Sequence, residues 1–140
     1  SSNLASVKIE EGNIIRIGSS QRSSITSARR HAGNRIEALF LLAGAEVAHE
    51  NEYPGWAPRK GSPIVEISKQ SYIDLFGKEP VVRAIHAGLE CGMFLDVNPN
   101  LDMVSFGPTI RGAHAPGERL EIATVDKFRV LLEEILKRVK

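Results

Sequence analysis

The feature that most constrains this chain is a break at residues 53–63, YPGWAPRKGSP. It places three prolines and two glycines within eleven residues of a 140-residue chain. Proline cannot donate a backbone hydrogen bond and glycine favours no regular element, so neither a helix nor a central strand can run through this stretch. We therefore expect the chain to fold as two segments with a boundary in this stretch.

The first segment has the pattern of a β-hairpin, a helix and a weaker strand. Apolar residues alternate over residues 4–9 and recur at 14–17, and Gly12-Asn13 can supply the positive φ angles of a tight turn. From Ser24, apolar residues recur at three- and four-residue spacing until Gly44, which predicts a helix. Residues 45–53 alternate weakly and predict another strand. We expect a small sheet with one helix packed on it, an α+β arrangement.

The second segment begins with a helix, because Ser62-Pro63 offers an N-cap and a first-turn proline. The apolar stripe of this helix ends before Gly77. Two short apolar stretches, residues 81–85 and 103–106, then predict strands. From Thr124 onward, apolar residues fall on one helical face and charged residues on the other, which predicts an amphipathic helix. The order helix, strand, strand, helix indicates an α/β arrangement.

Composition narrows the classes of function. The chain has 18 Lys and Arg residues against 17 Asp and Glu residues, and the basic ones are dispersed, so we expect no nucleic-acid or membrane partner. No apolar run approaches the roughly 20 residues of a membrane span. Cys91 is the single cysteine and cannot form an internal disulfide, which favours a reducing, cytoplasmic location. The chain lacks an initiator methionine, and we expect it to be part of a longer protein.

Glycine-rich polar loops follow both predicted strands of the second segment. In α/β sheets, ligands bind beyond the carboxyl ends of strands, so these loops are candidate sites. His114 lies in one of them, GPTIRGAHAPGER, which two prolines restrain. A neutral imidazole there could bind zinc or act as an acid or base. Local spacing offers His114 no second ligand and by itself favours a solvated loop histidine, while Glu118 could orient the loop.

Three further side chains are weaker candidates. Arg22, in SSQRSS, lies between a predicted strand and a predicted helix, where its guanidinium and free amide groups could bind a carboxylate. An exposed arginine beside an N-cap explains this stretch equally well. His86 directly follows a predicted strand, and a structural role is the simpler interpretation. Cys91 lacks a base partner in the sequence and is better explained as a small apolar side chain than as a nucleophile.

Four motifs in register point to a known family: SSQRSS, NEYPGWAP, IHAGLECGMF and LDMVSFGPTIRGAHAPGER. Together they resemble the C-terminal third of the bacterial aminoacyl-histidine dipeptidases, or Xaa-His dipeptidases, which belong to the two-zinc metallopeptidases. The resemblance implies a fragment of a two-domain protein. Residues 1–57 would form the latter part of an α+β lid domain, and residues 58–140 the end of an α/β catalytic domain.

The resemblance also implies an activity and a set of site residues. Family members hydrolyse Xaa-His dipeptides with a metal-held water, using zinc, for which cobalt or manganese could substitute. In this chain the metal ligand would be His114, and the substrate contacts would be Arg22 and Gly88. The family's other ligands and its general base belong to an N-terminal part. We therefore expect no catalytic residue in this segment and no activity from the segment alone.

The sequence is also compatible with a different class of function. The chain could be a non-catalytic ligand-binding or interaction module that associates with a second copy of itself, since apolar strands with free edges favour pairing. The expected partners are thus a small dipeptide substrate and, in a homodimer, another copy of the chain.

Overall fold

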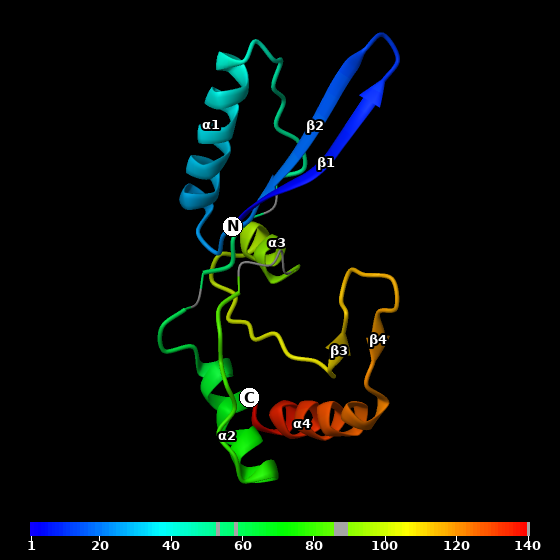
Figure 1. Cartoon of the computed structure of the whole chain (residues 1–140). Helices are drawn as coiled ribbons and strands as arrows, with labels where there is room; N and C mark the ends of the chain where they lie inside the picture. Colours follow the sequence, from blue (N-terminus) through cyan, green and yellow to red (C-terminus); the bar gives the residue numbers. More distant parts are fainter. Residues whose placement is uncertain (53, 58, 86–89, 140) are drawn as a thin grey trace. The chain divides into compact units, whose positions relative to one another are not determined.

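The structure is a computed structural model that describes residues 1–52, 54–57, 59–85 and 90–139. It contains two compact units, whose elements are labelled in Figure 1. The first unit comprises Ser1–Pro58 and Arg83–Leu101, and the second comprises Arg59–Val82 and Asp102–Lys140. Each unit thus gathers two separate stretches of the chain. The expected division of the protein at residues 57 and 58 into lid and catalytic domains stays a prediction.

A long antiparallel hairpin opens the first unit. It pairs β1 (Ser2–Glu10) with β2 (Ile14–Gln21). The turn between them uses positive φ angles at Gly12 (81°) and Asn13 (60°), which confirms the predicted turn. Apolar residues face one another across the ladder, in the pairs Val7–Ile17 and Ile9–Ile15. These four side chains are 41% to 80% exposed, so the hairpin has an apolar face that the described residues do not fully cover.

Two helices complete the first unit. The predicted first helix is confirmed as α1 (Thr26–Leu42), whose buried Gly33 lies against the His49 side chain. The second, α3 (Glu90–Val97), lies where the sequence predicted only a loop. Gly92 of α3 lies so close to the Pro54 backbone that an added Cβ would lie 2.6 Å from the proline carbonyl oxygen. A glycine at this position is therefore required for the close approach of the two segments.

The second unit begins with the predicted helix, α2 (Pro63–Phe76). Ser62 is buried, and its hydroxyl accepts a hydrogen bond of 3.2 Å from the Val65 amide, as expected of an N-cap. The Asp102 carboxylate accepts a second one, of 3.0 Å, from the Ile64 amide. That backbone bond is the main reason why the pKa of Asp102 lies below its usual value. Two side chains distant in sequence thus cap the same helix.

The last predicted helix is confirmed as α4 (Val125–Arg138) and carries the core of the second unit. Leu131 and Ile135, one turn apart on the same face, are its buried side chains, and α4 packs against α2. The Phe106 ring also lies 5.6 Å from the Phe128 ring, centroid to centroid. This packing holds the segment before the His114 loop against α4.

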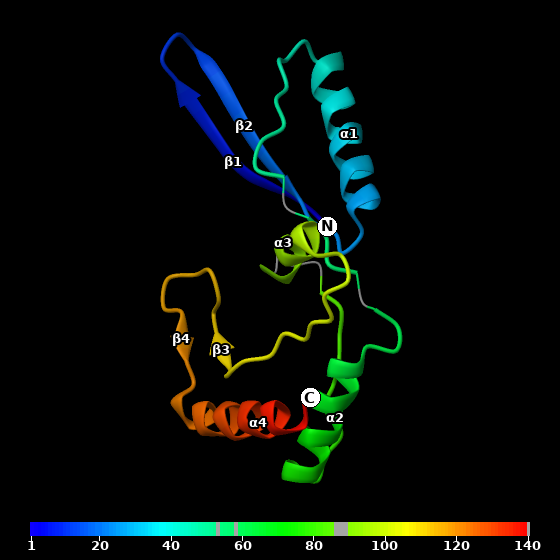
Figure 2. The ribbon, with the colours of Figure 1, turned by 180° about the vertical axis from the view of Figure 1, so that it is seen from behind.

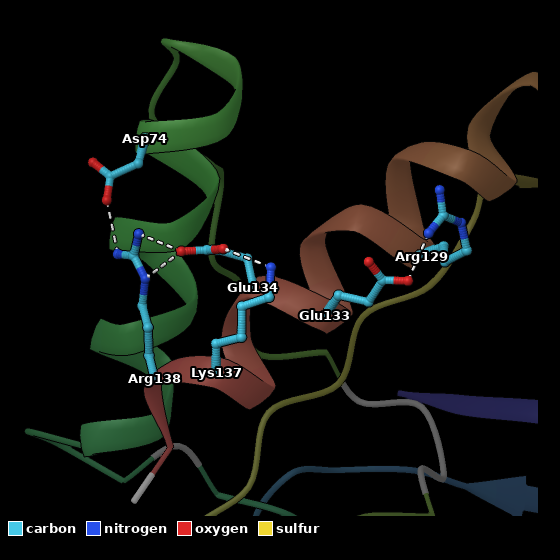
Figure 3. Close-up of polar contacts among 6 residues, drawn as sticks. All are labelled: Asp74, Arg129, Glu133, Glu134, Lys137 and Arg138. Atoms are coloured by element: carbon cyan, nitrogen blue, oxygen red, sulfur yellow. Dashed lines mark hydrogen bonds and ion pairs between the residues drawn. The ribbon is translucent and has the colours of Figure 1, made fainter.

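Charged side chains join the outer faces of α2 and α4, as Figure 3 shows. Arg138 donates to Asp74 of α2 at 2.7 Å and to Glu134 of its own helix at 2.7 Å. The hydrogen bond from Arg138 holds the pKa of each carboxyl below its usual value. Arg129 and Glu133 form a separate pair at 2.6 Å along α4. The Arg138 cluster therefore links the end of α4 to α2.

Three predicted strands are wrong. Residues 45–52, 81–85 and 103–106 have no strand pairing in the structure. Their apolar residues suit a sheet, but a strand of an α/β sheet exists only when a neighbouring strand pairs with it, and the described residues provide none there. The second unit instead has one very short antiparallel pair in the region predicted as a loop: β3 (Ile110–Arg111) and β4 (Arg119–Leu120).

Candidate functional site

The His114 loop is framed by β3 and β4, which pair through Ile110–Leu120 and Arg111–Arg119. Figure 2 shows that this two-stranded ribbon of β3 and β4 leads into the N-terminal end of α4. His114 has a φ of 62°, in the left-handed region that few residues other than glycine adopt. Gly112 and Gly117 are also left-handed, with φ angles of 65° and 89°. The loop thus makes a compact turn in which His114 holds the one unusual non-glycine conformation.

Hydrogen bonds inside the loop hold this conformation. The His114 amide donates to Oε2 of Glu118 at 2.8 Å. The Ala115 amide donates to the Gly112 carbonyl at 3.1 Å, and the Glu118 amide donates to the Ala115 carbonyl at 3.0 Å. Glu118 therefore bonds the loop at two points, and its carboxylate is directed at the backbone of His114.

The base of the loop is fastened to the start of α4. The Thr109 amide donates to Oγ1 of Thr124 at 2.8 Å, and that hydroxyl donates to the Glu121 carbonyl at 2.7 Å. The Glu121 amide returns a bond of 2.9 Å to the Thr109 carbonyl. An ion pair of 3.0 Å between Arg111 and Glu121 closes the ribbon. The packed helix therefore anchors the loop at both of its ends.

The donor set of this loop fits part of a metal site. The side chain of His114 is exposed, so a ring nitrogen is accessible to a ligand. A zinc site uses three or four protein ligands. Across the residues that the structure describes, no three His, Cys, Asp or Glu side chains form a group that could hold a metal ion. His114 thus fits as one ligand of a site whose remaining ligands these residues do not supply.

Arg22 belongs to the first unit and lies where the sequence predicted, between β2 and α1. Its side chain is exposed, and its backbone is held by hydrogen bonds of 2.9 and 2.7 Å with Ser1. The N-cap of α1, Ile25, provides no side-chain hydrogen bond to the helix. The exposed side chain of Arg22 therefore lies just before a helix start that has no side-chain cap, and its role as a substrate contact stays a prediction.

Two candidate residues lie outside the described part of the chain. Gly88 and His86 fall within residues 86–89, so the structure does not test the roles expected for them. Cys91 is described, lies in α3 and is half-buried. Its position agrees with its interpretation as a packing side chain.

The sequence did not indicate a cavity of about 150 Å³ at the start of α1. Its lining comes from three segments and comprises Thr26, Arg29, Arg30, Glu52, Pro54 and Asp96. Glu52 accepts a hydrogen bond of 3.0 Å from Arg29, which lowers the pKa of Glu52. These two residues are 23 positions apart, so no local spacing could have revealed the pair.

No helix in the described ranges is both long and apolar enough to cross a membrane.

Comparison with known proteins points to one class of enzyme. No family model matches the chain. The chain is 42% identical over 118 residues to the cytosol non-specific dipeptidase of Escherichia coli strain K12. The match covers 84% of this chain and 24% of the relative, so the chain spans about a quarter of the relative's length. Helices with small antiparallel sheets are consistent with a fragment of a two-domain peptidase. The similarity therefore supports assignment of the chain to a dipeptidase family.

Proposed function

We propose that the full-length protein containing this chain is a metal-dependent dipeptidase located in the cytoplasm. The observation that carries the proposal is the identity of 42%, over 84% of the chain, to a cytosol non-specific dipeptidase. The substrates are small dipeptides, and we propose that those with a C-terminal histidine are among them, as the motifs of the sequence imply.

In this proposal His114 supplies one imidazole ligand to zinc. Its exposed side chain and its firmly bonded loop support the assignment, because a fixed backbone limits the directions that the ring can take. Zinc held there would supply a Lewis acid that activates water for attack on the peptide carbonyl. Zinc binds imidazole in its neutral form, through the ring nitrogen that carries no proton.

Arg22 contributes to the binding of substrate. Arginine binds a carboxylate through two parallel hydrogen bonds, and every dipeptide carries a C-terminal carboxylate. The exposed side chain of Arg22, beside the uncapped start of α1, supports this role. Gly88 is proposed as a backbone contact to the substrate.

The 140-residue segment alone is proposed to be inactive. A catalytic zinc site needs three protein ligands and a general base, and this segment is proposed to contribute one ligand. The remaining groups would come from the part of the protein that corresponds to the other three quarters of the relative.

The test is hydrolysis by the full-length protein of paired dipeptides that differ only in whether histidine or alanine is C-terminal. Activity should require metal, disappear after chelation and return with zinc; cobalt and manganese are tested in parallel. Hydrolysis of the alanine dipeptide without hydrolysis of the histidine dipeptide would refute the histidine part of the proposal but not the dipeptidase assignment. No hydrolysis of either substrate with any of the three metals would refute the assignment itself.

The exposed apolar face of the hairpin favours a second candidate function, self-association with another copy of the chain. Ile9 is 80% exposed and Ile15 is 63% exposed, although they pair across the ladder. Burying such side chains between two copies would remove apolar surface from water. Light scattering after size-exclusion chromatography should show a dimer that Ile9→Lys converts to a monomer. A wild-type monomer at all concentrations would exclude this function.

A further inference from the structure

We infer that Glu118 is a positioning residue for His114: its carboxylate binds the His114 backbone amide and fixes the left-handed conformation from which the imidazole is presented. This inference rests on the proposed role of His114 as a metal ligand. It assigns to Glu118 a function that requires no contact between Glu118 and the metal or the substrate.

The conformation of His114 is the first observation that carries the inference. A left-handed backbone is unfavourable for a residue with a Cβ relative to ordinary helical geometry, because the Cβ comes too close to the backbone. The φ of His114 is 62°, and the loop would relieve this strain if the residue were free to turn. A specific interaction must therefore hold it there.

Of the hydrogen bonds that hold the loop, the one that the Glu118 carboxylate accepts is donated by His114 itself. The distance from the His114 nitrogen to Oε2 is 2.8 Å, which is within the range of a hydrogen bond to a charged acceptor. A charged acceptor makes such a bond stronger than a neutral one. The bond also closes a ring of five residues, from 114 to 118, around the histidine.

Residues 114–118 are the part of the loop whose conformation depends on Glu118, because other contacts hold the two ends of the loop. At its base, Thr109 and Thr124 are joined by a hydrogen bond, and Arg111 and Glu121 are joined by an ion pair. The ends of the loop are thus fixed independently of Glu118. A change at Glu118 should reorient His114 without unfolding the ribbon that carries it.

The test uses the full-length protein and three substitutions at Glu118, with zinc affinity measured by competition with a chromophoric chelator. Glu118→Ala removes the acceptor. Glu118→Asp keeps the charge but shortens the side chain by one methylene. Glu118→Gln keeps the side-chain length and an acceptor oxygen but removes the charge. Glu79→Ala changes an exposed glutamate of the same unit and serves as the matched control. Circular dichroism checks that each variant is folded.

Zinc affinity should fall about 10-fold in Glu118→Ala and Glu118→Asp, the lower end of the effect of losing a partner of a metal ligand. Glu118→Gln should stay within about 3-fold of wild type, because its side-chain oxygen still accepts the amide. Glu79→Ala should match wild type. Exchange of the His114 amide with solvent should be faster in the alanine and aspartate variants than in wild type.

Two results separate failure of this inference from failure of the proposed function. If His114→Ala loses zinc but Glu118→Ala binds it as tightly as wild type, the positioning role is wrong and the ligand role stands. If His114→Ala binds zinc as tightly as wild type, the ligand role is wrong and the positioning role falls with it. A glutamine variant as weak as the alanine variant would also overturn the inference. If the alanine variant does not fold, the zinc affinities of Glu118→Asp and Glu118→Gln are compared instead, and equal affinities would overturn the inference.

Discussion

Ile135→Ala should destabilise the second unit, which carries the His114 loop, by about 2.5–3 kcal/mol. Ile135 is 3% exposed, so the substitution removes three buried carbons from the core of α4. At about 0.8 kcal/mol for each buried carbon, the lost transfer free energy is about 2.4 kcal/mol. The cavity left behind adds to this cost. Alanine has a better helix propensity than isoleucine, which offsets less than about 0.5 kcal/mol of this destabilisation.

Leu136→Ala is the matched control, because it removes the same number of carbons from the next position of the same helix. Leu136 is 63% exposed, so about a third of the transfer free energy is lost, or less than about 1 kcal/mol. Urea unfolding of the 140-residue chain, followed by circular dichroism at 222 nm, gives both free energies. Equal losses in the two variants, or a larger loss in Leu136→Ala, would refute the assignment of the core.

Three further predictions follow from the caps, the charges and the proposed substrate contact. Ser62→Ala should lower the free energy of unfolding by about 1 kcal/mol, because the amide of Val65 loses its capping acceptor; thermal unfolding measures this, and no change would contradict the cap. The hydrogen bond from Arg138 lowers the pKa of Asp74 in the folded protein. The stabilisation of the folded state by this pair is therefore complete above the unfolded-state pKa of about 3.9, and it is lost as the pH falls through the lower folded-state value. Urea midpoints measured from pH 6 to pH 2 should therefore fall less steeply in Asp74→Asn than in wild type, and identical slopes would count against the pair. In the full-length protein, Arg22→Ala should raise KM for a dipeptide about 10-fold or more, with Arg22→Lys intermediate; unchanged KM would remove Arg22 from the site.

Elements defined by local interactions could be predicted from the sequence. The hairpin turn at Gly12 and Asn13 needs positive φ angles, and both residues supply them. The start of α2 at Ser62 and its end at Gly77, which has a φ of 63°, depend on residues within one turn of the helix. Such signals act over a few positions, so a single sequence contains them.

Elements defined by distant partners could not be predicted. Residues 81–85 and 103–106 have apolar patterns that suit strands, but pairing decides whether a strand forms, and no pairing occurs there in the structure. The helix at Glu90–Val97 was missed because its glycine suggested a loop. That glycine is explained instead by its close contact with the backbone of Pro54.

The candidate site divides in the same way. The sequence located the His114 loop and indicated that Glu118, four residues on, could orient it, and the hydrogen bond between them lies within that local range. The attachment of the loop to Thr124 joins positions 15 residues apart and has no sequence signature. The pairing of Arg29 with Glu52 is also non-local and was found only in the structure.

The proposed role of His114 as a metal ligand of a dipeptidase can be tested by removing its imidazole. The rate of zinc-dependent dipeptide hydrolysis is compared between the full-length wild-type protein and its His114→Ala variant, at matched protein and zinc concentrations. We predict that the wild type hydrolyses the dipeptide and that the variant loses at least about 100-fold in kcat/KM, since the site lacks one of its ligands. Zinc-dependent hydrolysis by the variant at the wild-type rate would contradict the claim.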